Sequence, residues 1–145
     1  MHLPHIRCYH SAALINPHVF YILCKGMNAG KPGFKPWVNS FAVICNNKES
    51  FDFFFWLVYG LWKDGMFKIK LRGTAIPFIN LNDVRDTIRE IAPAIQPDWN
   101  KYQQILEALS KLEKRKASLA EQIIATSSLQ THLLRTYFSA KKVPG

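Results

Sequence analysis

The loop Gly26–Pro32, GMNAGKP, is the stretch whose residue types most suggest a phosphate site. A P-loop needs four residues between its glycines and a Ser or Thr after the lysine, and a helix follows it. Here three residues separate Gly26 from Gly30, and Lys31 is followed by Pro32 and more loop. The spacing therefore argues against nucleotide hydrolysis at this loop.

The segment 25–39 can still supply charge to a partner. Its three glycines and two prolines predict a loop rather than regular structure. Three lysines lie in it: Lys25, Lys31 and Lys35. One interpretation of this loop is that its lysines contact nucleic-acid phosphates, which does not require the phosphate-binding backbone of a P-loop. The other is a solvated loop packed over the core by Phe34 and Trp37.

A second candidate turn, Arg72–Thr74, combines a cation, a glycine and a hydroxyl. The glycine permits a positive φ or the close approach of another segment. Ala75–Ile79 is apolar, which predicts a short buried strand, and Pro77 favours a sheet edge because it lacks a donor. Asn80 or Asn82 is expected to cap the helix that follows.

Metal and catalytic sites have little support in the sequence. His5, Cys8 and His10 are zinc-ligand types, but no second half of a recognised site follows them. The acids of segment 83–90 alternate with arginines, which is typical of a solvated, salt-bridged helix face. No Ser/His/Asp or Cys/His arrangement stands out. We therefore expect no enzyme activity, no metal and no cofactor.

Composition favours one soluble domain with an anionic partner. The chain has 145 residues, 48% hydrophobic and 20% charged, with a net charge of +9. Residues 1–97 carry 11 Lys or Arg and 6 Asp or Glu, and residues 98–145 carry 8 and 4, so the charge is not confined to a tail. Nucleic acid is the first candidate partner. The alternative is a merely basic, soluble protein.

Cysteine use and hydropathy favour the cytoplasm. The three cysteines are an odd number without paired spacing, which does not indicate a disulfide framework. The N-terminus lacks the long apolar core of a signal peptide. The most apolar run, Phe51–Trp62, is too short to span a bilayer, so we expect no membrane association.

Hydrophobic patterns predict the elements of the first part. We expect strands at residues 18–24, 40–45, 66–71 and 76–79, and helices at residues 46–63 and 81–92. Asn46 or Asn47 begins the first helix, and Glu49 lies in capping-box spacing from Asn46. This helix is aromatic on nearly every side, so it should be buried on more than one face. Pro93 and Pro97 are expected to end the second helix.

From residue 98 to residue 140 the pattern changes to alternating steps of three and four. Residues at this spacing lie along one side of a helix, which we call the seam. They are Tyr102, Ile105, Leu109, Leu112, Lys116, Leu119, Ile123, Thr126, Gln130, Leu133 and Tyr137. Eight of these eleven are apolar, which predicts a coiled-coil-type helix that one chain cannot bury alone. It either folds back as a hairpin near Ser127–Ser128 or pairs with another chain. Its polar seam residues loosen the pairing or specify its register.

Together these elements predict an α+β fold. A small mixed or antiparallel sheet should surround a buried aromatic helix, followed by a long C-terminal helix or helical hairpin. The expected divisions are a globular domain at 1–97, a coiled-coil-type helix or hairpin at 98–140, and a flexible tail at 141–145.

Two family resemblances rest on specific segments. Gly73–Asn80 followed by Asp83–Val84 resembles part of the target-recognition domain in specificity subunits of type I restriction–modification systems, in which a long helix also follows. The first 95 residues also resemble a family of small bacterial proteins of unknown function, with a KG-N-GKP loop, an NSF strand and a GLW helix end.

The first resemblance implies a non-catalytic module that binds duplex DNA. Lysines would neutralise phosphates, while Asn28 or Arg72 would reach base edges. The implied contact residues are Lys25, Asn28, Lys31, Lys35, Arg72 and Thr74. The chain has one such domain where the subunit has two, and Gln103–Ile105 only loosely matches the family's long helix, so methyltransferase docking is in doubt. The alternative is a protein-interaction or assembly protein, of the kind encoded on mobile elements, that self-associates through residues 98–140.

Overall fold

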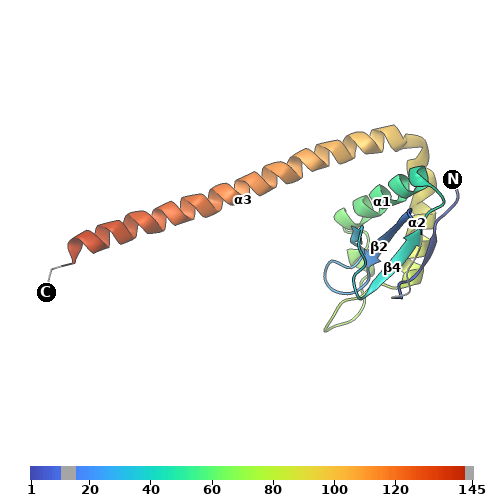
Figure 1. Ribbon diagram of the computed structural model, residues 1–145, viewed down its shortest axis with the longest axis horizontal. Coiled ribbons are helices and arrows are strands. Elements are labelled where there is room, and N and C mark those ends of the chain that lie inside the picture. Colours follow the sequence, from blue (N-terminus) through green and yellow to red (C-terminus); the bar gives the residue numbers. More distant parts are fainter. Residues whose placement is uncertain (11–15, 143–145) are drawn as a thin grey trace. The chain divides into compact units, whose positions relative to one another are not determined.

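The computed structural model describes residues 1–10 and 16–142. The chain divides into two compact units, Met1–Trp99, called the head below, and Asn100–Gly145. Its elements in order are β1 (His5–Cys8), β2 (Val19–Leu23), β3 (Pro32–Gly33), β4 (Ser40–Ile44), α1 (Lys48–Lys63), the 3₁₀ turn η1 (Lys68–Lys70), α2 (Leu81–Ile95), the 3₁₀ turn η2 (Gln96–Asp98) and α3 (Trp99–Lys141). The predicted α+β class is confirmed (Figure 1).

The head is built on an antiparallel sheet with strand order β1-β4-β2-β3. The register places Ile6 opposite Val43 and Val43 opposite Phe20, and it also pairs Ile22 with Phe41. Residues directly opposite each other share a face, so these five side chains form one apolar face. All five are buried in a single core cluster to which α1 and α2 also contribute.

Helix α1 is capped at both ends. The Oδ1 atom of Asn47 accepts a hydrogen bond of 2.8 Å from the backbone N–H of Ser50. This cap puts Ser50 rather than Glu49 at the third helical position, so the predicted capping box is wrong. At the other end Gly65 has a φ of +86°, and the backbone N–H of Met66 donates to Leu61. This is the Schellman arrangement, in which a glycine reverses the chain.

The aromatic side chains of α1 are buried on more than one side, as predicted. Phe54 faces the core and is 1% exposed, while Phe55 is covered from outside by the ring of Phe34 at 4.5 Å between centroids. Trp56 is the exception, since it keeps 38% of its surface exposed. The position of Trp56 follows from the helical period, because a step of two residues turns by about 200° and places Trp56 on the side of α1 away from Phe54 and the core.

The strand predicted at residues 66–71 is wrong, because this segment contains η1 instead. An alternating strand would place Phe67 and Ile69 on one face, yet Phe67 is fully buried and Ile69 is 82% exposed. The backbone bonds locally, with the N–H of Lys70 donating to Phe67 and that of Leu71 to Lys68. The sequence alternates, but no neighbouring strand pairs with it.

The strand predicted at residues 76–79 is also wrong, as is its burial. Its pairing is limited to isolated bridges of Phe78 with Lys25 and Arg72, and to the backbone bonds that Pro77 and Ile79 make beside the first bridge. Ile79 is buried, whereas Ile76 is 66% exposed. A short apolar run next to a proline can thus form a loop that contributes one anchor to the core.

The remaining differences concern the ends of elements. β1 was missed because its burial does not alternate, with only Ile6 buried. Helix α2 begins after Asn80 without a side-chain cap, and it continues through Pro93 to Ile95. Within the predicted loop 25–39, two residues form β3.

The long helix excludes one of the two alternatives left by the sequence, the hairpin. α3 is a single helix of 43 residues that runs unbroken through Ser127–Ser128, so a hairpin is not formed (Figure 1). None of its residues is buried. Across residues 1–10 and 16–142, no helix is both long and apolar enough to cross a membrane.

The two aromatic environments on α1 predict different costs of truncation. Phe54→Ala should lower the free energy of unfolding by about 3–5 kcal/mol, through lost transfer energy and a cavity. Trp56→Ala should cost only about 1–2 kcal/mol, because part of the ring already contacts water. Urea unfolding followed by circular dichroism measures both. Equal costs for the two variants would contradict the described orientation of α1.

Candidate nucleic-acid interface

The loop after β2 is held by two glycines in the left-handed region. Gly26 and Gly30 have φ of +95° and +101°. A Cβ on Gly30 would lie 2.6 Å from the ring of Phe67, so only glycine fits against this buried side chain. The backbone N–H of Gly30 donates to Leu23, and that of Lys31 to Asn28. The loop that resembled a P-loop is therefore a tight turn fixed to the core.

The turn at residues 72–78 lies directly beside this loop. The backbone N–H of Gly26 donates to Pro77 at 2.7 Å, and Phe78 forms antiparallel bridges with Lys25 on one side and Arg72 on the other. Bridge partners project to the same face, so Phe78 shares a face with two cationic residues. Phe78 is 38% exposed. The structure thus joins two predicted contact residues through one that the sequence did not suggest.

A second pair of cations meets over an aromatic ring at the end of α1. The Nζ atoms of Lys31 and Lys63 lie 5.5 Å and 5.7 Å from the ring centroid of Trp62. Both are within cation–π range. Lys31 was a predicted contact residue, whereas Lys63 and Trp62 had been treated only as parts of the core helix.

A shallow pocket lies beside Trp62 and Lys63. It has a volume of about 270 Å³ and is lined by Met27, Asn28, Ala29, Trp62, Lys63, Gly65 and Lys68. Asn28 and Lys68 are exposed side chains at its rim. The sequence assigned Lys68 to a strand, and no local pattern could have placed it beside Asn28.

The result is a basic surface contributed by three segments of the head. We define the basic surface as Lys25, Lys31, Lys63, Lys68 and Arg72, all of which are exposed. Two carboxylates adjoin it. Asp64 follows Lys63 directly, and Asp83 forms a salt bridge of 3.2 Å with Arg72. The surface also has a structural role, since cations near the C-terminal end of α1 complement its partial negative charge.

The other predicted contact residues lie around or beyond the basic surface. Asn28 is on the pocket rim, and Thr74 is exposed in the turn after Arg72. Lys35 follows Phe34, whose ring stacks over Phe55 in the first half of α1 rather than near Trp62. Among the predicted contact residues, Lys35 thus has no described contact with the basic surface.

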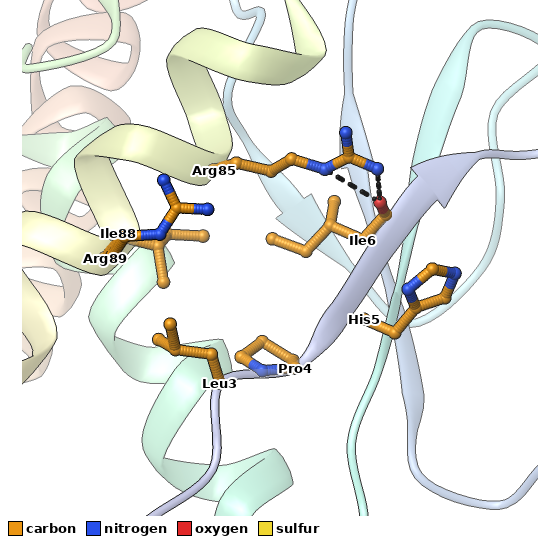
Figure 2. A pocket seen from close by; sticks show the side chains of 7 residues that line it. All are labelled: Leu3, Pro4, His5, Ile6, Arg85, Ile88 and Arg89. Carbon is orange, nitrogen blue, oxygen red and sulfur yellow. Dashed lines mark hydrogen bonds between the residues drawn. The ribbon is translucent and has the colours of Figure 1, made fainter.

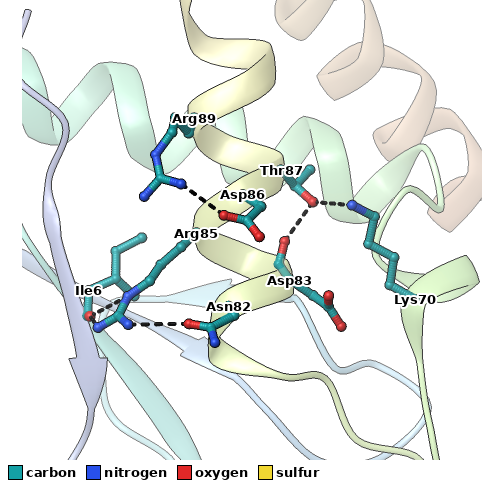
Figure 3. A network of polar contacts seen from close by, with 8 residues as sticks. All are labelled: Ile6, Lys70, Asn82, Asp83, Arg85, Asp86, Thr87 and Arg89. Carbon is teal, nitrogen blue, oxygen red and sulfur yellow. Dashed lines mark hydrogen bonds and ion pairs between the residues drawn. The ribbon is translucent and has the colours of Figure 1, made fainter.

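The acids and arginines of α2 form a structural network. Arg89 pairs with Asp86 at 2.9 Å, and Arg85 donates to the backbone carbonyl of Ile6, as Figure 3 shows. The hydroxyl of buried Thr87 donates to the carbonyl of Asp83 and accepts from Lys70 at 2.6 Å. The charged groups of α2 thus bond to other groups of the head and hold the helix in place. This is what we expect of a salt-bridged face.

A pocket of about 240 Å³ lies between β1 and α2. Figure 2 shows the guanidinium of Arg85 at the carbonyl of Ile6, beside the apolar side chains of Leu3 and Ile88. β1 is at the edge of the sheet, and this carbonyl points away from β4. Arg85 therefore covers part of an edge that would otherwise pair with another strand.

The thiols of Cys24 and Cys45 lack the environment of reactive nucleophiles. Burial raises the pKa of Cys45 to about 12, and a hydrogen bond involving Ser50 only partly offsets this effect. Burial likewise raises the pKa of Cys24, against the opposing effect of Lys25. A raised pKa keeps a thiol protonated at neutral pH. In the part of the chain that the structure describes, no three His, Cys, Asp or Glu side chains gather into a metal site, so His5, Cys8 and His10 do not form one.

Comparison with known proteins gives one match. A family model described as a family of unknown function (DUF6943) matches residues 6–136, which is most of the chain. No curated protein and no solved structure shows a significant match.

Proposed function

Because the chain belongs to DUF6943, a family of unknown function, we propose a role from surface chemistry: a non-catalytic module whose head binds duplex DNA. The observation that supports it is the basic surface, on which five cations from three segments adjoin only two carboxylates. Such a group of cations attracts the negatively charged phosphate backbone of nucleic acid.

Different residues of this region would contact different parts of the DNA. Lys31 and Lys68 are exposed ammonium groups without an acidic neighbour in the described contacts, so they neutralise phosphates. Asn28 carries an amide that can bond to a base edge. Arg72 has one nitrogen on Asp83, which fixes the guanidinium and leaves other N–H groups for a phosphate or a guanine.

The resemblance to specificity subunits supports the same surface. It implied that the loop 25–35 and the turn 72–74 contact DNA, and these segments adjoin each other through Phe78. Lys35 lies apart, so we propose that it contributes only weakly. That resemblance stays a prediction, as does the absence of catalysis.

Replacing one lysine of the basic surface tests the proposal. Lys31→Ala should weaken binding to all duplex sequences about equally and reduce the slope of log K against log salt by about 1. Lys48→Ala is the matched control, because Lys48 lies at the other end of α1, paired with Asp52. Fluorescence anisotropy with labelled duplexes at several salt concentrations measures both.

Two outcomes would contradict DNA binding. One is equal salt slopes for Lys31→Ala, Lys48→Ala and the unaltered protein. The other is no binding of the unaltered protein to duplex DNA at low salt and micromolar concentration. Circular dichroism of each variant shows whether the head remains folded.

A second candidate function, assembly through α3, has its own supporting observation. Ten large apolar residues of α3 are between 46% and 67% exposed: Ile105, Leu112, Leu119, Ile123, Ile124, Leu129, Leu133, Leu134, Tyr137 and Phe138. Apolar patches of this extent usually mark interaction sites. An isolated helix gains little stability from its own hydrogen bonds, so burial of this stripe would stabilise it.

A charge placed in the seam tests assembly. Leu112→Asp should convert an oligomer into a species of the single-chain mass, 16.7 kDa, in multi-angle light scattering. Ser118→Asp adds the same charge at a position outside the seam and should leave the mass unchanged. A single-chain mass for the unaltered protein at all concentrations would contradict assembly through α3.

A further inference from the structure

The positions of the polar residues in the seam of α3 restrict how two copies of the helix can align. In heptad notation Tyr102 occupies an a position and Ile105 a d position, and this alternation continues to Tyr137. Three seam residues are polar: Lys116 and Gln130 at a, and Thr126 at d. All of residues 114–142 are exposed, so no described contact within the chain covers this part of the seam.

We propose that α3 pairs with α3 of a second copy of the chain in antiparallel orientation. This inference rests on the assembly function proposed above and adds the partner and its direction. It commits to two copies, overlapping along nearly the whole helix with their centre near residue 121.

A single charged seam position decides between the two directions. In a parallel pair in register, equivalent a positions face each other, so Lys116 would meet Lys116 of the second copy inside the seam. In the antiparallel pair, a positions alternate with d positions, and full overlap sets Lys116 opposite Thr126. The two Lys116 residues are then about 15 Å apart along the helix axis, beyond the Debye length of about 8 Å at physiological salt.

The same alignment separates the basic run of the helix. Residues 111–116 contain four cations and one carboxylate. A parallel pair would place this run beside its own copy. The antiparallel pair places it beside residues 126–131, which carry no formal charge. Repulsion between like charges is thereby reduced along the whole segment.

Most apolar seam residues remain matched in this register. Seam positions that face one another are Leu109 with Leu133, Ile123 with Leu119, and Tyr137 with Ile105. Of the flanking residues, Leu106 lies near Leu134 of the second copy. The antiparallel alignment thus removes the contact between lysines and keeps these large apolar pairs, although Leu112 then faces Gln130.

The orientation has a consequence for the heads. Each head joins the first residue of its α3, and a helix of 43 residues is about 65 Å long. An antiparallel pair therefore carries its two heads at opposite ends, joined by a semi-rigid spacer. Two basic surfaces on one particle would bind one long duplex, or two duplexes, with greater avidity than a single head.

Distances between spin labels test the orientation. Cys8→Ser and Cys24→Ala remove the accessible thiols, while Cys45 is 2% exposed and can stay. A nitroxide at Ser139→Cys should give a distance of about 50 Å between the two copies if they are antiparallel, and below about 20 Å if they are parallel. A nitroxide at Ser118→Cys, near the centre, should give below about 20 Å in either case.

The two label positions separate failure of the inference from failure of assembly. A long distance from Ser139→Cys with a short one from Ser118→Cys supports the antiparallel pair. Short distances from both overturn the antiparallel orientation but leave assembly intact. Absence of dipolar coupling at Ser118→Cys, with a single-chain mass in light scattering, overturns both.

Discussion

The head depends on covering one apolar face of a small antiparallel sheet. The aligned side chains of β1, β4 and β2 form that face, and the aromatic helix α1 is buried against it together with α2. The volume of these rings determines what can lie next to them. Phe67 completes the core only because Gly30 has no side chain, and this contact holds the loop after β2 at the C-terminal end of α1. The packing of the core is therefore also what gathers the basic surface.

The sequence predicts those parts of the fold that local physics controls. The strands at β2 and β4, the helices α1 and α2, and the long α3 follow from periodicity, capping and the absence of breakers. Segments 66–71 and 76–79 were mistaken for strands, because an alternating or apolar run forms a strand only where a neighbour offers hydrogen bonds. Pro93 was expected to end α2, yet the helix continues two residues past it, although the carbonyl of Arg89 loses the donor that another residue at position 93 would supply. β1 escaped notice because a short edge strand with one buried residue has no detectable period.

The candidate site could be predicted only in part, for the same reason. Lys25, Lys31 and Arg72 were identified by charge and by neighbouring glycines. Lys63 and Lys68 join them only through tertiary contacts around Trp62, which no spacing in the sequence reveals. Lys35 was identified by charge in the same way, but it lies outside the basic surface, because the neighbouring Phe34 stacks on Phe55 in another part of α1. The head thus carries a basic surface, and α3 carries a stripe of exposed apolar side chains.

We propose that duplex DNA binds at this basic surface. Titrating ¹⁵N-labelled protein with a short duplex and following amide chemical shifts tests it most directly, because every segment of the head reports separately. The account predicts that the largest changes lie at residues 25–31, 62–68 and 72–78, and that they disappear at high salt. Changes centred on the pocket between β1 and α2, or no changes at low salt, would contradict it.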